Sequence, residues 1–240
     1  MSPENKTVFV LHTSLALVEP LKGLFQRELP DVRMVNIVDD SLLADVRAAG
    51  GLTPSVVRRM VGYALLAQSA GADALFNACS SVGEAADIIR RTVDIPVVKI
   101  DEPMAAAAAA QGERIAVVAT VPTTLDPTIR LIERQAAAAG RSVSTARHLV
   151  EGAIDVLVSG DAARHDRMVT ERIEQAAQAA DVVVLAQASM ARLVPQLAGR
   201  LPVPVLASPE SGVRELKRVL DQSSASARHA PTRASCPAVG

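Results

Sequence analysis

The sequence predicts an α/β fold made of two similar Rossmann-like lobes, each with a parallel sheet, and a cleft between the lobes. Short apolar segments alternate with longer amphipathic segments along most of the chain, which is typical of strands joined by crossover helices. The alternation runs through two cycles of similar order. Nearly half of the 240 residues are apolar, so the chain can bury a sizeable core.

The first cycle contains four short apolar runs that we interpret as strands. These runs cover residues 7–11, 32–38, 74–78 and 97–100. Helices are expected over residues 15–27, 54–70 and 83–91, where apolar side chains recur at helical spacing. Pro54 and Gly71 bracket the longest of these helices, because proline favours the first turn and glycine the position after the last.

The second cycle begins after an alanine-rich helix that Asp101 and Pro103 open and that runs to about Gln111, since alanine is the best helix former. Strands are expected over residues 114–120, 142–147, 181–186 and 203–207, and helices over 123–138, from 155, over 165–179, 191–198 and 212–220. We therefore expect residues 1–103 plus 204–220 to form the N-terminal lobe and residues 104–203 the second lobe. Residues 221–240 lack any period and are expected to be a disordered tail.

Composition and charge exclude several classes of function. The net charge of −1 gives no reason to expect nucleic acid or a membrane surface as a partner. No signal peptide is visible, and the longest apolar stretches are too short to span a bilayer. Cys79 and Cys236 cannot form a disulfide framework, so a cytoplasmic location is expected. The histidines lack metal-ligand spacing and no phosphate-binding glycine motif is present, so we expect no metal and no cofactor.

Cys79 is the strongest candidate for a catalytic residue. It follows a short buried strand and precedes Ser81 and Glu84, which have the spacing of a capping box at a helix start. Free amides and the positive end of a helix dipole would favour the thiolate. The alternative is that Cys79 is a small buried apolar residue, which is the commonest role of a free cysteine.

Small polar residues follow four of the expected strands. Ligands of open α/β sheets bind at the carboxyl ends of the strands, so these clusters could line one cleft. The candidates for substrate binding are Thr13, Ser14, Ser80, Ser81, Thr120, Thr123, Gln187 and Ser189. Their hydroxyl groups could stabilise charge that develops on a substrate carboxylate. Helix capping would equally explain Ser81 and Thr123, because Thr123 and Asp126 also have capping-box spacing, and a polar turn would explain Gln187 and Ser189.

Three further positions carry titratable side chains. His12 adjoins Thr13 at the first strand end and could carry a second proton. The acidic segment 39–41 follows the second strand and could reach the cleft, although a turn that starts a helix explains it more simply. His165 lies in a charged helical stretch, which is typical of a solvated surface.

Several segments resemble motifs of the aspartate/glutamate/hydantoin racemase superfamily. The segment 78–81, Ala-Cys-Ser-Ser, resembles the first cysteine motif of that family, and the segment 184–190 resembles the second. Thr120 and Thr123 resemble the family's threonine turn, and the likeness covers residues 6–220. It implies a two-lobed enzyme that needs neither pyridoxal phosphate nor metal, acts on a small carboxylate or amino acid, and forms a homodimer or higher homo-oligomer.

The likeness fails at the second cysteine. Family racemases place one cysteine on each face of the substrate α-carbon, but Gln187 stands at the second position here, and an amide cannot act as an ordinary acid or base. The resemblance therefore implies an isomerase that uses Cys79 alone. It also implies two enzyme alternatives: a decarboxylase of substituted malonates with Cys79 as the proton donor, and attack of Cys79 on a double bond as in maleate isomerases. The third alternative is a non-catalytic module that binds a small carboxylate.

Overall fold

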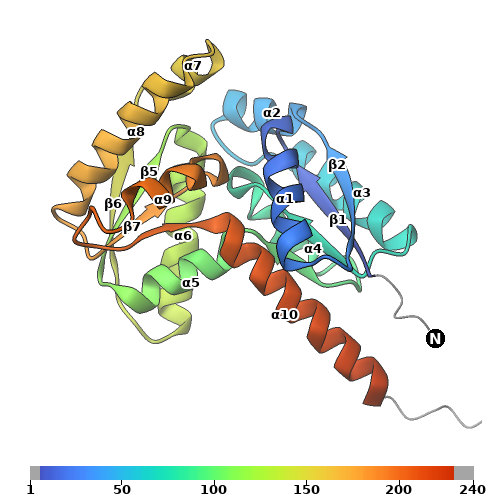
Figure 1. Cartoon of the computed structure of the whole chain (residues 1–240). Helices are drawn as coiled ribbons and strands as arrows, with labels where there is room; N and C mark the ends of the chain where they lie inside the picture. Colours follow the sequence, from blue (N-terminus) through green and yellow to red (C-terminus); the bar gives the residue numbers. More distant parts are fainter. Residues whose placement is uncertain (1–5, 230–240) are drawn as a thin grey trace, which may run out of the picture.

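The computed structural model describes residues 6–229, which form two α/β lobes side by side (Figure 1). Each lobe contains a four-stranded parallel sheet with helices on both faces, as the alternating sequence pattern predicts. Within the described residues, no helix combines the length and the apolar character that crossing a membrane requires.

The first lobe is built on a sheet with the strand order β2-β1-β3-β4. Its strands are β1 (Thr7–His12), β2 (Arg33–Val38), β3 (Ala74–Asn77) and β4 (Val97–Lys99). One face is covered by α2 (Ser41–Ala49), α3 (Pro54–Ser69) and α4 (Ala85–Ile89), and the other by α1 (Val18–Glu28) and α10 (Ser208–His229). Two short 3₁₀ helices, η1 (Leu15–Leu17) and η2 (Ser80–Val82), follow the ends of β1 and β3.

The second lobe repeats this arrangement with the strand order β6-β5-β7-β8. Its strands are β5 (Arg114–Ala119), β6 (Ser144–Leu149), β7 (Val182–Leu185) and β8 (Val205–Ala207). One face is covered by α5 (Glu102–Gln111) and α6 (Pro122–Ala138). The other is covered by α7 (Ala153–Val158), α8 (Ala162–Ala177), η3 (Ala188–Leu193) and α9 (Val194–Leu197).

The two lobes also share a hydrogen bond between an aspartate and the first residue of the neighbouring strand. In the first lobe, the Asp73 carboxylate accepts a hydrogen bond from the Thr7 amide at 2.7 Å. In the second lobe, the Asp181 carboxylate accepts one from the Arg114 amide at 2.8 Å. Asp73 comes directly before β3 and Asp181 directly before β7, so each aspartate fixes the start of its strand to the neighbouring strand, β1 or β5.

The chain returns to the first lobe later than the sequence indicated. Residues 205–207 pair with β7 as the edge strand of the second sheet, so the predicted return at residue 204 is wrong for this strand. The crossover occurs at α10, whose Val213, Leu216 and Leu220 are buried against the first sheet (Figure 1). Backbone pairing with β7 decides the position of β8. The three apolar residues of β8 would suit either sheet, so the sequence does not show which sheet they join.

The last helix is also longer than predicted. Residues 221–229 were expected to be disordered, but they continue α10 to His229. This segment contains no glycine or proline, and a helix that is already nucleated adds further residues at little cost. The remainder of the predicted tail, residues 230–240, lies outside the described residues.

Packing corrects one further prediction. His165 was interpreted as a surface residue, but its side chain is only 1% exposed. Its Nδ1 atom lies 2.8 Å from the Asp166 carboxylate, and α8 turns the ring toward the core of the second lobe. A polar residue within a charged helix can occupy the buried face when a neighbour supplies its hydrogen bond.

Candidate functional site

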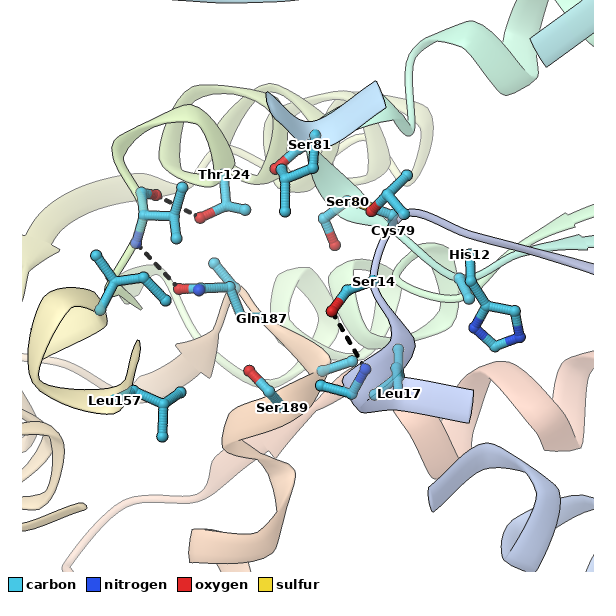
Figure 2. A pocket seen from close by; sticks show the side chains of 18 residues that line it. His12, Ser14, Leu17, Cys79, Ser80, Ser81, Thr124, Leu157, Gln187 and Ser189 are labelled. Carbon is cyan, nitrogen blue, oxygen red and sulfur yellow. Dashed lines mark hydrogen bonds between the residues drawn. The ribbon is translucent and has the colours of Figure 1, made fainter. Parts of the chain in front are cut away.

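A pocket of about 180 Å³ lies where the carboxyl ends of the two sheets face each other. Figure 2 shows Cys79, Ser80 and Ser81 on one side of it and Gln187 and Ser189 from the second lobe across from them. The sequence-predicted residues that line it are Thr13, Ser14, Cys79, Ser80, Ser81, Gln187 and Ser189. The structure therefore brings together residues from both lobes that are more than 100 positions apart in the chain.

Strand register explains why these residues meet. Leu11 of β1 pairs with Asn77 of β3, so two residues further on Thr13 comes beside Cys79. In the second lobe Val118 of β5 pairs with Leu185 of β7, so two residues further on Thr120 comes beside Gln187. Gln187 consequently occupies the position in the second lobe that Cys79 occupies in the first.

The environment of Cys79 keeps its thiol protonated. Burial raises the pKa of Cys79, and this effect outweighs the hydrogen bond from the Thr13 hydroxyl and those from the backbone amides of Ser81 and Val82. The negative charge of Asp101 acts in the same direction as burial. The amides at the helix start favour the thiolate as expected, but burial outweighs them, so the net shift of the Cys79 pKa is upward. The helix that follows Cys79 is a single 3₁₀ turn, too short to build a substantial dipole.

The capping box predicted at Ser81 and Glu84 does not form. The Ser81 hydroxyl oxygen is buried without a hydrogen-bond partner, and the residue is 3% exposed. The Glu84 carboxylate instead forms two hydrogen bonds with the Arg130 guanidinium of α6, at 2.7 and 3.0 Å. Glu84 thus joins the two lobes, and the Ser81 hydroxyl stays available at the pocket wall.

The second predicted capping box, at Thr123 and Asp126, does not form either. Asp126 pairs with Arg147, and the Thr123 hydroxyl oxygen is buried without a partner beside a separate, more polar pocket. Thr124, which was not singled out from the sequence, lines the main pocket and donates to the Val121 carbonyl at 2.6 Å. Both threonines lie in the first turn of α6. The residue at which that helix begins decides which of the two side chains faces the main pocket.

Gln187 is held by the end of β5 while it lines the pocket. Its Oε1 atom accepts hydrogen bonds from the Thr120 amide at 2.6 Å and the Val121 amide at 3.3 Å. Its Nε2 atom donates to the Thr120 hydroxyl at 2.9 Å. Thr120 is thereby buried as a partner of Gln187 and does not line the pocket. The carboxamide supplies no titrating proton on this side.

His12 lies at the pocket wall on the same lobe as Cys79. Its Nε2 atom is 2.8 Å from the Asn36 side-chain oxygen, its Nδ1 atom is buried without a partner, and burial lowers its pKa. Because His12 extends from β1, beside β3, it cannot stand opposite Cys79 across a ligand. Its proposed function as a replacement for the second thiol is therefore not supported by its position.

The remaining candidates serve local structure. Ser14 accepts a hydrogen bond from the Ala16 amide at 3.3 Å and caps η1 while lining the pocket (Figure 2). Asp39 accepts from Tyr63 at 2.8 Å and pairs with Arg59, so the acidic segment that contains it holds α3 and does not line the pocket. No cluster of three or more histidine, cysteine, aspartate or glutamate side chains suited to a metal occurs in residues 6–229.

The pocket also contains apolar residues that sequence reasoning did not single out. Leu17 of η1 and Leu43 of α2 line it from the first lobe, and Ile154 and Leu157 of α7 line it from the second. Ile154 and Leu157 are three residues apart, which predicts a shared helix face. The sequence does not show whether this face lines the pocket or packs into the core of the second lobe.

Comparisons with known proteins agree with this architecture. The family model for Asp/Glu/hydantoin racemase matches residues 8–216. Allantoin racemase from Klebsiella pneumoniae is similar in structure, with a TM-score of 0.69 at 18% identity over 97% of this chain and 96% of that one. A glutamate racemase from Bacillus anthracis gives a TM-score of 0.67 at 18% identity over 92% of this chain and 84% of that one. Arylmalonate decarboxylase gives 0.57 at 16% identity, over 89% of this chain and 92% of that one. A search of curated protein sequences gave no significant match.

Proposed function

Because the chain belongs to the Asp/Glu/hydantoin racemase family, we propose that it is a cofactor-independent enzyme in which Cys79 transfers a proton at the α-carbon of a small carboxylate. The observation that carries this proposal is the position of Cys79, which lines the interlobe pocket among hydroxyl groups. Thiols, hydroxyls and backbone amides are the groups that such a reaction needs in order to move a proton and to stabilise an enolate.

In the proposed reaction, the small fraction of Cys79 that is ionised takes the α-proton, and the electron pair of the C–H bond moves into the substrate carboxylate; burial keeps this fraction small. The hydroxyl of Ser81, which has no hydrogen-bond partner in the protein, lines the pocket and can donate to the oxygens that gain charge, whereas Ser80 donates to Asp101 and Thr124 to the Val121 carbonyl. The proton then returns from sulfur to carbon. Since Gln187 offers no second acid, Cys79 acts from one face only.

The test is exchange of the α-proton. Incubation of small carboxylates and amino acids in deuterated water should give deuterium at the α-carbon with the wild-type protein, followed by NMR. Cys79→Ser should reduce the exchange rate by a factor of at least about 100, because the base is lost. Cys236→Ser, which removes the other cysteine, is the matched control and should leave the rate unchanged. Equal rates for wild type and Cys79→Ser would refute the proposal.

Decarboxylation is the second candidate, and the protonated state of Cys79 favours it. In this reaction a substituted malonate loses carbon dioxide, the electron pair of the broken C–C bond stays on the α-carbon, and the Cys79 thiol delivers its proton there. A single protonated thiol suffices, so Gln187 is no obstacle. Release of carbon dioxide from monosubstituted malonates, lost in Cys79→Ser, would identify this reaction. A protein that binds carboxylates but shows neither exchange nor release would be a binding module.

A further inference from the structure

Among the residues that the structure describes, no charged side chain lines the pocket. Its 18 lining residues include no aspartate, glutamate, lysine or arginine. The two titratable groups present are neutral at pH 7, because burial lowers the pKa of His12 and raises that of Cys79. The buried Asp101 and Lys99 do not line the pocket, and Asp101 lies behind Ser80, whose hydroxyl hydrogen-bonds to it.

The pocket has a polar side formed by Cys79 and η2, and a facing side that carries leucines together with Ser189. Figure 2 shows Ser80 and Ser81 near Cys79 on one side, and Leu157 and Leu17 on the opposite side. Two polar groups of the pocket wall are buried without a partner, the His12 Nδ1 atom and the Ser81 hydroxyl, although such groups are normally hydrogen-bonded. A carboxylate placed beside η2 would give the Ser81 hydroxyl a partner. Ile154, which lies on α7 with Leu157, also lines the pocket, and Leu43 lines it from α2, which contacts η2.

These walls discriminate between charged and uncharged substituents. A carboxylate can accept a hydrogen bond from the Ser81 hydroxyl, which has no other partner. An ammonium group would lose its hydration without gaining an anionic partner, and a distal carboxylate would lose its hydration against leucine and isoleucine. Both losses weaken binding, because an unpaired ion is costly to remove from water.

From this we infer that the substrate is a carboxylate whose α-carbon bears an apolar substituent, with no ammonium group and no charge on the side chain. The carboxylate lies on the side of Ser80 and Ser81, and the substituent packs against Leu157 and Ile154. The inference rests on the proposed function and specifies its substrate class. It separates this protein from enzymes that act on acidic amino acids.

Four compounds of similar size test the two charges independently. 4-Methylpentanoate has neither extra charge, leucine adds the ammonium group, glutarate ends in a second carboxylate instead of the branched methyl groups, and glutamate has both extra charges. Binding measured by calorimetry on wild type and on Cys79→Ser should be at least about tenfold tighter for 4-methylpentanoate than for the other three, by the reasoning above. Binding of leucine, glutarate or glutamate as tight as that of 4-methylpentanoate would overturn the inference, as would tighter binding of uncharged hydantoin or no binding of 4-methylpentanoate.

A pair of neighbouring substitutions locates the apolar side. Leu157→Arg places a cation in the pocket wall and should weaken 4-methylpentanoate binding and favour glutarate. Val158→Arg is the matched control, because Val158 is 78% exposed and does not line the pocket, and it should leave both affinities unchanged. Equal responses of the two variants would contradict the assignment of Leu157.

Binding and catalysis fail separately in these experiments. The affinity pattern does not need the Cys79 thiol, so it can hold in a protein that shows no α-proton exchange. Conversely, Cys79-dependent exchange of glutamate or leucine, together with their tight binding, would sustain the proposed function and refute the substrate class.

Discussion

Cys79 lies among groups that act on its charge in opposite directions. The Thr13 hydroxyl and the Ser81 and Val82 amides stabilise the thiolate, whereas burial and the Asp101 carboxylate favour the thiol. Burial is the largest of these effects, so the free protein holds a protonated sulfur. A bound carboxylate in the same pocket would reinforce that state, since like charges resist being brought together.

The alkylation rate of Cys79 should therefore rise mainly at pH values above the ordinary pKa of cysteine. In a Cys236→Ser background, the rate of alkylation by iodoacetamide should reach its midpoint above the ordinary pKa of cysteine, because only the thiolate reacts. Thr13→Val should move the midpoint to still higher pH by removing a hydrogen bond to sulfur. Thr92→Val, at an exposed position in the turn after α4, is the control and should not move it. A midpoint below the ordinary value would show that burial does not dominate.

The role of a side chain in the site depends on hydrogen-bond partners that are far away in the sequence. The pattern around Gln187 predicted a polar residue at a strand end, and the structure confirms its place beside the pocket. The sequence could not show that its carboxamide binds Thr120 and Val121, because those residues are 67 and 66 positions away. Likewise, the sequence predicted the pair Ser81 and Glu84 as a cap, but Arg130 from the other lobe binds the glutamate.

At the scale of elements, local spacing placed every strand but misjudged how helices begin. Cys79 is followed by a 3₁₀ turn, and α4 does not begin until Ala85, because the chain must bend around the buried Asp101 and Lys99. Gly83 permits this bend: a Cβ atom there would lie 3.1 Å from the Ser80 carbonyl oxygen. Such close approaches are invisible in a periodic pattern.

The aspartate before β7 should make the second lobe sensitive to acid. Hydrogen bonds from the Arg114 side chain and from the Arg114 and Glu113 amides lower the pKa of Asp181 to about 2. The folded-state pKa lies below the unfolded value of 3.8, so the stabilisation is fully present above pH 4 and is lost as the pH falls through 2. Asp181→Asn should lower the midpoint of urea unfolding at pH 7, and the difference from wild type should vanish near pH 2.

Asp73→Asn provides the matched comparison for that measurement. It removes the equivalent contact to the Thr7 amide in the first lobe, where no arginine takes part. Its effect at pH 7 should be smaller, because it removes a single hydrogen bond. A difference between Asp181→Asn and wild type that persists undiminished at pH 2 would contradict the argument.

At the scale of the whole molecule, α10 and the pair Glu84–Arg130 connect the two lobes. The helix leaves the second sheet after β8 and buries Val213, Leu216 and Leu220 in the first lobe. Gly212 permits this docking, because a Cβ atom there would lie 2.6 Å from the Ile100 carbonyl oxygen. The walls of the pocket are thus held in place by a segment that does not line it.

Leu216→Ala should destabilise the protein by about 2–5 kcal/mol, because it removes a fully buried side chain and leaves a cavity. Chemical denaturation with a fixed m-value measures the loss. Lys217→Ala, one residue along on the exposed face, should change stability by less than about 0.5 kcal/mol. A loss for Leu216→Ala as small as that for Lys217→Ala would show that α10 does not support the first lobe.

The sequence by itself determined the alternation of strands and helices, the doubled architecture, and the gathering of Thr13, Cys79 and Gln187 at strand ends. These features follow from local periodicity and from the rule that parallel strands present their carboxyl ends together. Tertiary structure alone decided that Cys79 is protonated, that Gln187 is bound to Thr120, that Thr124 and not Thr123 lines the pocket, and that β8 joins the second sheet. The physical reason is that desolvation, charge pairing and edge-strand pairing depend on groups far apart in the chain, whose distances only the folded state fixes.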